Sequence, residues 1–435
     1  MNSTPHSFPR RKFLTTGAAA LAWAPLARLR GQTTSPNDEI AMGCVGVGGQ
    51  GSGNMGNFLN IKGVRVVAVC DVDADKAKAA KAKVDAFYKN QDCKIYAHHR
   101  DLLQHPGLDV VSLATPDHWH ARIGIDCANA GKDVYGEKPF TWGLAEGRLL
   151  VEALKKNNRV WQTGCWQRSG GEFRRFKALI ENNTLGKMTR FECGTPSGMS
   201  IKQHVPADKV ADLIGKPPEN LDWKTYSAPV GDFPYHPLIH PWNWRWHNSF
   251  GGGQLLDWVG HHVDIALWTL GLDGTGPVKM EGTGENGTHD FFNTYIKYKY
   301  QGTFADGRVL EVRSDFGGTK FTGEKGWIHV NRGKIVASDK LDDTTGDPRH
   351  PLLSNLPADF DTKPPSHYQN FIDCVRSRKL TVAPAEAAHR AASFGQLAIV
   401  AMDTKQPLKW DPKTETVLDN PEQAKHTRLS SRVAG

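Results

Sequence analysis

Two residues four positions apart, Asp257 and His261, carry the clearest acid–base chemistry in this sequence. On an α-helix this spacing places both side chains on one face. A carboxylate beside an imidazole can orient the ring and raise its basicity, which suits a histidine that accepts a proton from a substrate. We therefore expect a catalytic pair, with His261 as the base.

A second reactive group is predicted where two strands end. Thr115-Pro116 follows one predicted strand, and Glu137-Lys138-Pro139 follows the next. Ligands of open α/β sheets bind at the carboxyl ends of the strands. We therefore expect Lys138, held between a glutamate and a proline in such a loop, to face a bound ligand.

A glycine fingerprint predicts a dinucleotide site. Gly46, Gly48 and Gly51 follow a predicted strand and precede a predicted helix. They permit a tight turn, close approach of the backbone to a pyrophosphate, and close packing of helix on strand. Asp71 ends the next strand, where a carboxylate can bind ribose hydroxyls. Asp71 and Asp73 would repel a 2′-phosphate, so the sequence favours NAD over NADP. A glycine turn of another α/β protein is the alternative.

The elements around these motifs predict an α/β chain with two folded domains. Up to residue 164, short β-branched strands alternate with helical segments, which indicates a Rossmann domain with a doubly wound parallel sheet at 39–164. After it we expect an α+β domain with a large, mostly antiparallel open sheet at 165–410, for substrate binding and oligomerisation, and a C-terminal tail at 411–435. The predicted strands are 40–46, 64–70, 109–114, 133–135, 159–163, 295–300 and 308–313, and the predicted helices 76–88, 100–104, 121–130, 145–157, 368–377 and 385–401.

Together these motifs resemble the glucose–fructose oxidoreductase/inositol dehydrogenase (Gfo/Idh/MocA) family, across residues 39–410. The resemblance implies NAD as cofactor, a small carbohydrate or cyclitol as substrate, and a homo-oligomer formed through the second domain's sheet. It implies that Lys138 and His261 flank the substrate carbon, that Asp257 binds a neighbouring hydroxyl, and that the Lys138–Pro139 bond is often cis. The implied cofactor residues are Gly46, Gly48, Gly51, Asp71, Thr115, Pro116, His120, Glu137 and Lys138.

Several further residues are candidates for the substrate side. Gln167 and Arg168 stand where relatives place such residues, and His262 replaces an aspartate that family members often carry. Trp244 and Arg245 lie in an aromatic stretch, 221–250, that could stack on sugar faces, although core packing or an oligomer interface explains it equally well.

No metal site is predicted. Asp257, His261, His262 and Asp264 have suitable side chains, but adjacent helix positions diverge by about 100°, and tetrahedral ligation needs three or four convergent ligands. The cluster at 117–120 opens a predicted helix, which favours capping and contacts at the cofactor edge.

The first 32 residues predict an export signal. Arg10 and Arg11 precede a small apolar run at 17–27, a layout typical of the twin-arginine pathway, which transports folded proteins. We expect a periplasmic or otherwise exported protein, with the export machinery as partner. A basic disordered tail and an uncleaved anchor are the alternatives.

Charge and cysteine content exclude other classes. Of the net charge of +8, five positive charges lie in residues 1–32, and the remaining +3 leaves no nucleic-acid footprint. No later segment approaches the roughly 18 apolar residues of a membrane span. The seven cysteines contain no Cys-x-x-Cys pair, so we expect buried thiols without disulfides or zinc.

Three functions fit these predictions. The first is NAD-dependent oxidation of a sugar, glycoside or cyclitol hydroxyl with a retained cofactor. The second is a redox-neutral glycosidase or epimerase that passes through a transient keto-sugar. The third, a sugar sensor with structural NAD, is disfavoured by the intact set of Lys138, Asp257 and His261.

Overall fold

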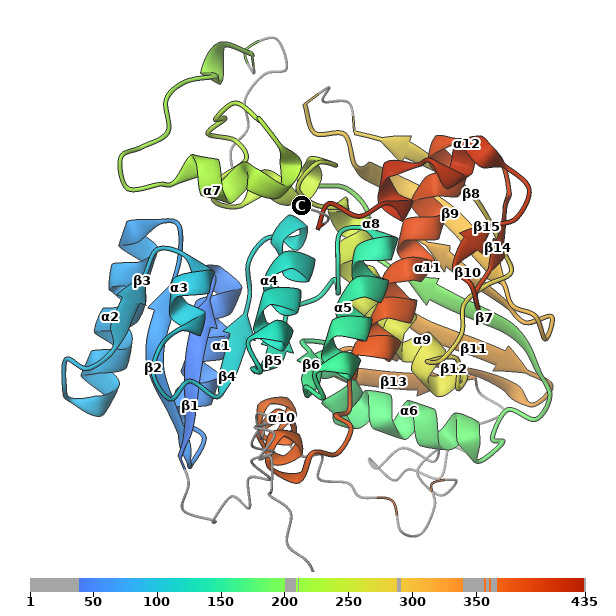
Figure 1. Cartoon of the computed structure of the whole chain (residues 1–435). Coiled ribbons are helices and arrows are strands. Elements are labelled where there is room, and N and C mark those ends of the chain that lie inside the picture. Colours follow the sequence, from blue (N-terminus) through green and yellow to red (C-terminus); the bar gives the residue numbers. More distant parts are fainter. Residues whose placement is uncertain are drawn as a thin grey trace, which may run out of the picture. The chain divides into compact units, whose positions relative to one another are not determined.

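The computed structural model describes residues 39–199, 209, 211–287, 291–338, 356, 360 and 366–433. The predicted export signal at 1–32 lies outside them. From Glu39 onward the chain forms one unit built on two β-sheets (Figure 1).

The N-terminal sheet is parallel, with the strand order β3-β2-β1-β4-β5-β6, which confirms the predicted Rossmann fold. Its strands are β1 Ile40–Val45, β2 Val64–Cys70, β3 Lys94–Tyr96, β4 Val110–Leu113, β5 Asp133–Gly136 and β6 Trp161–Thr163. Its helices are α1 Gly49–Leu59, α2 Ala74–Tyr88, α3 His99–Leu103, α4 Asp117–Asn129 and α5 Leu144–Lys156. The sequence did not predict β3, because this three-residue strand has no buried residue and hence no apolar pattern.

The second sheet has nine strands in the order β13-β12-β11-β7-β10-β9-β8-β14-β15. Among the described strands of this sheet, only β7 and β10 pair in parallel, which confirms the mostly antiparallel prediction. The strands are β7 Met188–Gly194, β8 Lys279–Asn286, β9 Tyr295–Thr303, β10 Val309–Arg313, β11 Gly318–Gly323, β12 Gly326–Asn331, β13 Lys334–Ala337, β14 Leu408–Asp411 and β15 Thr416–Val417. The helices are α6 Gly171–Glu181, α7 Trp223–Ser227, α8 Gly253–Trp258, α9 Asp264–Thr269, α10 His367–Ser377, α11 Ala385–Asp403 and α12 Pro421–Ala424. Side chains of α6, α8, α9 and α11 form one core with this sheet.

The last part of the chain returns to the N-terminal sheet. Phe371 of α10 is buried in the same core as Met42 of β1 and Phe58 of α1. Helix α11 lies beside α5 and contributes Ala392 to the core on that side (Figure 1). The Rossmann sheet is therefore covered in part by helices encoded some 200 residues after its last strand.

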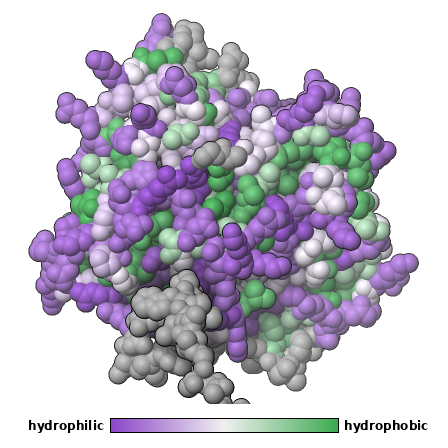
Figure 2. Space-filling model, viewed as in Figure 1, coloured by the Kyte–Doolittle hydropathy of each residue, from purple (hydrophilic) through white to green (hydrophobic). Residues whose placement is uncertain are grey.

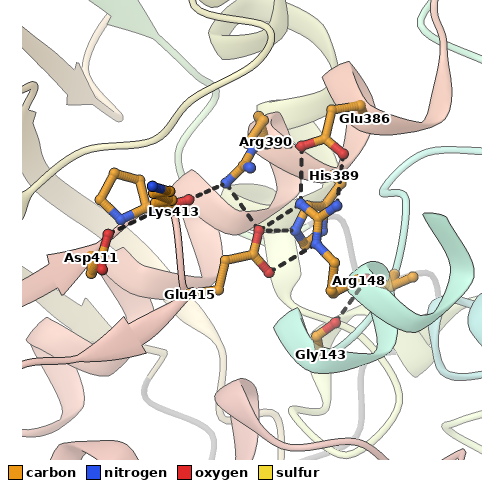
Figure 3. A network of polar contacts seen from close by, with 10 residues as sticks. Gly143, Arg148, Glu386, His389, Arg390, Asp411, Lys413 and Glu415 are labelled. Atoms are coloured by element: carbon orange, nitrogen blue, oxygen red, sulfur yellow. Dashed lines mark hydrogen bonds and ion pairs between the residues drawn. The ribbon is translucent and has the colours of Figure 1, made fainter. Parts of the chain in front are cut away.

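A network of charged side chains joins α5, α11 and the turn between β14 and β15 (Figure 3). Arg148 contacts Glu386 at 2.8 Å and Glu415 at 2.7 Å. Arg390 contacts the same two carboxylates at 2.8 and 3.0 Å, and His389 Nε2 lies 2.8 Å from Glu415. Each carboxylate thus has two guanidinium partners, which fixes the turn against both helices.

The C-terminal residues pack on both domains. Arg428 is buried and donates hydrogen bonds to the backbone oxygens of Trp142, Asn248 and Gly251 at 2.6–3.1 Å. The backbone N–H of Arg432 donates to Glu146 at 3.0 Å. The segment predicted as a tail is therefore an integral part of the fold.

The surface and the cysteines agree with the sequence-based expectations. Polar side chains predominate on the face in Figure 2, and apolar ones occur there in small groups. All seven cysteines are free and buried, as predicted. In the described part of the chain, no helix combines the length and apolarity needed to cross a membrane.

Candidate active site

The glycine turn after β1 has the shape that a pyrophosphate site requires. Gly46 has a φ of +76°, and a Cβ there would lie 2.7 Å from the backbone of Ala114. A Cβ on Gly51 would lie 1.8 Å from the carbonyl oxygen of Gly46. Only glycine at these two positions allows α1 to approach β1, so that the backbone can approach a phosphate.

Asp71 follows β2 and lies beside this turn. Its carboxylate accepts hydrogen bonds from the backbone N–H groups of Val47 at 2.9 Å and Asp73 at 3.0 Å. Burial raises the pKa of Asp71, and these two bonds act in the opposite direction. The side chain lines the pocket, where its remaining lone pairs can accept from ribose hydroxyls.

One pocket joins the predicted cofactor residues to the predicted catalytic ones. The predicted residues that line it are Gly46, Gly48, Asp71, Thr115, Pro116, Glu137, Lys138, Trp244, Arg245 and Asp257. The glycine turn, the carboxylate at the end of β2 and the loops after β4 and β5 together fit NAD. Glu137 also accepts a hydrogen bond from Asn54 at 2.9 Å, which fixes its carboxylate.

Residues 220–250, here called the strap, cover the carboxyl ends of the N-terminal sheet (Figure 1). Tyr226, His240 and Trp242 of the strap line the same pocket. Trp223, Tyr226 and Phe250 belong to an apolar cluster that holds the strap together. The pocket is thus enclosed between the Rossmann loops and a segment of the second domain.

Backbone and side-chain contacts attach the strap to the N-terminal domain. Asp222 N donates to the carbonyl of Val72 at 2.9 Å, and Ala74 N donates to the carbonyl of Asn220 at 2.8 Å. Further along, Trp119 Nε1 donates to the carbonyl of Tyr226 at 2.9 Å. These bonds hold the strap over the groove at several points.

Lys138, Asp257 and Arg245 meet at one end of the pocket. Lys138 Nζ donates to Asp257 Oδ1 at 2.7 Å, and Arg245 Nε lies 3.9 Å from the same oxygen. Burial opposes ionisation of Asp257, but the two cations lower its pKa below the ordinary value. A Cβ on Gly260 would lie 2.8 Å from Lys138 Cβ, so glycine lets the turn after α8 pack on the lysine. The Lys138–Pro139 bond is cis, as the resemblance implies.

The predicted pairing of Asp257 with His261 is absent. Helix α8 ends at Trp258, and a π-helical turn, Val259–Val263, follows it. This turn changes the angle between positions four residues apart, on which the prediction relied. In addition, the Lys138 ammonium group attracts the carboxylate more strongly than a neutral imidazole does. Asp257 therefore positions Lys138 and not His261.

The His261 ring packs edge-on against two indole rings. Its centroid lies 5.2 Å from the ring centroid of Trp258 and 6.5 Å from that of Trp166. Burial, together with the nearby Lys138 and Arg332, lowers its pKa well below the ordinary value. Among the described residues its buried Nδ1 has no hydrogen-bond partner. The imidazole is thus neutral at pH 7, and His261 is not among the residues that line the pocket.

Two predicted substrate residues are placed behind the site. Arg168 is 1% exposed, and its guanidinium group is paired with Asp264 and Asp273 at 2.7–2.8 Å. Because these carboxylates use its donors, the structure assigns it a structural position and not the predicted substrate contact. Gln167 is fully buried and donates to the carbonyl of His261 at 3.3 Å, so it supports that residue from behind.

Two predicted histidines are also displaced from the pocket. The ring nitrogens of His120 lie 2.7 Å from the carbonyl of Pro139 and 2.8 Å from that of Thr115, so His120 joins two cofactor loops from behind. His262 Nδ1 lies 2.6 Å from the carbonyl of Gly194, which turns this ring toward the nine-stranded sheet. Neither His120 nor His262 is among the residues that line the pocket.

The sequence analysis missed one residue near the reaction site. Arg332, in the turn between β12 and β13, stacks between Trp166 and Trp258 at 4.8 and 4.7 Å. No local motif marks it, because its partners are distant in sequence. Asp117 belongs to the cluster at 117–120, for which contacts at the cofactor edge were expected, and it lines the pocket next to Pro116.

Comparison with known proteins agrees with this geometry. Residues 40–165 match the sequence profile of the Gfo/Idh/MocA oxidoreductases described as an NAD-binding Rossmann fold, and residues 169–433 match the profile of the oxidoreductase family's C-terminal alpha/beta domain. The chain belongs to the Gfo/Idh/MocA oxidoreductase family. NAD is therefore the cofactor of its N-terminal domain.

Individual relatives cover only part of this chain. A myo-inositol 2-dehydrogenase of Thermotoga maritima is 30% identical over 175 residues, 40% of this chain and 48% of the relative. A glycosyl hydrolase family 109 protein 2 of a Shewanella species is 30% identical over 186 residues, 37% of this chain and 41% of the relative. The chain thus matches less than half the length of either.

Solved structures share the fold over most of the chain. Scyllo-inositol dehydrogenase of Lactobacillus casei, solved with NAD(H) and scyllo-inositol, has a TM-score of 0.58 at 16% identity and covers 86% of this chain and 99% of its own. The WlbA dehydrogenase of Bordetella pertussis, solved with NADH and UDP-GlcNAcA, has a TM-score of 0.63 at 16% identity. The match covers 86% of this chain and 99% of the dehydrogenase.

Proposed function

We propose that this protein is an NAD-dependent oxidoreductase that oxidises a secondary hydroxyl of a sugar, glycoside or cyclitol. The contact of Lys138 with Asp257 at the end of the cofactor pocket carries this proposal. The contact gives the Lys138 ammonium group a fixed orientation in the pocket, which suits a cation that binds a substrate hydroxyl beside the nicotinamide. The inositol 2-dehydrogenases among the relatives support this substrate class.

The side chains divide the chemistry between them. Lys138 binds the substrate oxygen and stabilises negative charge on it, while Asp257 holds the ammonium group in place. His261, as a neutral imidazole, accepts the hydroxyl proton. NAD, when bound, would accept the hydride at C4 of its nicotinamide ring, from the carbon that carries this hydroxyl. The indoles of Trp258 and Trp166 shield His261 from water, which keeps its electrostatic contacts strong.

We further propose that the cofactor is retained and that the protein is exported folded. The strap covers the groove and is bonded to the N-terminal domain at several points, so the dinucleotide can leave only if these contacts open. Retention suits the twin-arginine signal predicted at 1–32, because NAD loaded before export would reach the periplasm with the protein. We expect a homo-oligomer formed through the nine-stranded sheet.

A redox-neutral reaction is the second candidate. In it, the protein would oxidise a hydroxyl, use the ketone to activate the neighbouring C–H bond for elimination or inversion, and then return the hydride. The similarity to glycosyl hydrolase family 109 proteins and the enclosed pocket favour it. A retained cofactor serves such a reaction without an external supply of NAD.

The test is to denature the exported, purified protein and measure released dinucleotide by mass spectrometry. Near-stoichiometric NAD would support retention, whereas an empty site would contradict it. The native protein is then mixed with cyclitols, sugars and glycosides, with reduced nicotinamide absorbance and product formation recorded. Net reduction supports the oxidoreductase. Bond cleavage without net reduction supports the redox-neutral candidate, and neither signal with any hydroxyl substrate would contradict both.

A further inference from the structure

A carboxylate in the pocket has no task in the hydride-transfer proposal. Asp117 is the first residue of α4, directly after Pro116, and lines the pocket together with Lys138, Arg245 and Asp257. It is only 5% exposed. In the part of the chain that the structure describes, its side chain forms no hydrogen bond and no ion pair. Buried carboxylates without partners are rare, because desolvation of the charge is costly.

The other acidic side chains of the pocket are already engaged. Asp71 accepts two backbone hydrogen bonds, Glu137 binds Asn54, and Asp257 binds Lys138. Among the described residues, Asp117 is therefore the pocket carboxylate that has no hydrogen-bond or ion-pair partner in the protein.

The surroundings of Asp117 suit a group that gains and loses a proton. Burial raises its pKa to about 7. Of the charged groups that face it, Arg245, Lys138 and Arg428 lower the pKa, whereas Asp257 raises it. At neutral pH both protonation states are populated, which is the condition for efficient general acid–base catalysis.

We propose that Asp117 is a second proton-transfer residue, which removes the proton from the carbon next to the carbonyl group of a keto-sugar or keto-cyclitol in this pocket. This inference rests on the proposed function, since oxidation of a hydroxyl by NAD creates that ketone. It assigns to this chain a second chemical step on the same substrate, and it favours redox-neutral elimination or inversion over simple dehydrogenation.

The step balances without any further reagent. The C–H electron pair becomes the enolate C=C bond, and the proton moves to a carboxylate oxygen of Asp117. Lys138, which already binds the carbonyl oxygen, stabilises the negative charge there. Where the next carbon carries an alkoxy group, the enolate re-forms the ketone as that C–O bond breaks, and the leaving oxygen takes up the proton that Asp117 removed. Otherwise the carbon regains a proton, from Asp117 on the original face or from water on the opposite face.

A hydrogen-exchange experiment isolates this step from hydride transfer. The protein loaded with oxidised NAD is incubated in D₂O with the ketone obtained by oxidising myo-inositol at one carbon, or with a methyl 3-ketoglycoside. Oxidised NAD cannot reduce the ketone, so deuterium at the adjacent carbon reports proton removal alone, by NMR. The variants are Asp117→Asn and Asp117→Glu, with Asp306→Asn in the exposed turn between β9 and β10 as matched control.

We expect Asp117→Asn to lower enzyme-dependent exchange about 100-fold or more. The loss should exceed any loss in reduction of NAD by the alcohol substrate, and Asp117→Glu should restore part of the exchange. Exchange in the unaltered protein should rise through a pH near 7 as Asp117 ionises.

Three results would overturn the inference. The first is hydrogen exchange by Asp117→Asn at the rate of the unaltered protein. The second is no exchange above that of buffer alone by the unaltered protein. The third is loss of bound NAD from Asp117→Asn while exchange stays intact, which would mean that Asp117 binds the cofactor. Failure of the proposed function looks different, because then no alcohol reduces NAD in the unaltered protein, whatever the ketone does.

Discussion

At the scale of single residues, the proposed chemistry depends on the contact between Lys138 and Asp257. Replacing Lys138 by methionine keeps the length of the side chain but removes the ammonium group that binds the substrate oxygen. We expect a loss of about 1000-fold in kcat/KM for NAD reduction, measured by absorbance in single-turnover mixing. Lys187→Met, on the surface, is the matched control. Full turnover by Lys138→Met would contradict the proposed mechanism.

Asp71 supports a second prediction at this scale. Asp71→Ser removes the acceptor for the ribose hydroxyls and shortens the side chain that binds Val47 N. We expect NAD to bind about 10- to 100-fold more weakly, since a hydrogen bond to a charged group contributes about 1.5–3 kcal/mol. Titration of the apoprotein by calorimetry measures this, with Asp306→Ser as control. Unchanged affinity would refute the assignment.

Residue types showed where chemistry occurs more reliably than they showed which side chains meet. The sequence placed Lys138, Asp257 and Asp71 in one site, and the structure brings them to one pocket. It could not reveal that a π-helical turn separates Asp257 from His261, because no residue pattern specifies such a turn. The buried pairing of Arg168 with Asp264 was equally invisible, since the partners are 96 positions apart.

At the scale of elements, the charged network in Figure 3 makes a pH-dependent contribution to stability. Hydrogen bonds and charges from His389 and Arg148 lower the pKa of Glu415 to about 2 against the effect of burial. A lowered pKa means that the ionised carboxylate stabilises the fold above the ordinary value of 4.5, and that this contribution is lost as the pH falls toward 2.

Glu415→Gln should therefore destabilise the protein by about 2 kcal/mol at pH 7, because hydrogen bonds from Arg148 and His389 to a charged carboxylate are lost, while Glu386 still pairs with both arginines. Urea unfolding at several pH values measures the difference from the unaltered protein, which should shrink below the ordinary pKa of a glutamate. Glu422→Gln, on the exposed side of α12, is the control and should have little effect. A difference that did not vary with pH would count against the ionic origin.

Local patterns predicted the regular elements well and the strap poorly. Strand β2 was predicted with its observed bounds, since its apolar and β-branched residues leave one interpretation. The stretch 221–250 was recognised only by composition. Its role as a cover over the cofactor groove depends on single backbone bonds, such as that from Asp222 to Val72, which no periodicity encodes.

At the scale of the whole molecule, the C-terminal residues are predicted to be essential for stability. Deleting 427–435 removes Arg428, which leaves the backbone oxygens of Trp142, Asn248 and Gly251 without that donor. We expect a loss of at least about 3 kcal/mol in the free energy of unfolding. Urea titration measures it, with deletion of 434–435 as control. Equal stability of the two deletions would show that this docking contributes nothing.

The two-domain plan was predictable from alternation of strands and helices, but the return of the chain was not. Helix α10 reads as an ordinary amphipathic helix, and nothing in its sequence says that Phe371 packs against the first sheet. Such long-range packing depends on surface complementarity between segments, which one sequence does not display.

This return path also sets the order in which the molecule can be completed as it leaves the ribosome. The glycine turn and all six Rossmann strands emerge first, but the strap, α10 and Arg428 come later. Until these segments have been made, the nascent chain has an open groove and an uncovered sheet. We therefore expect the groove to close over NAD only after the strap, α10 and Arg428 have been synthesised.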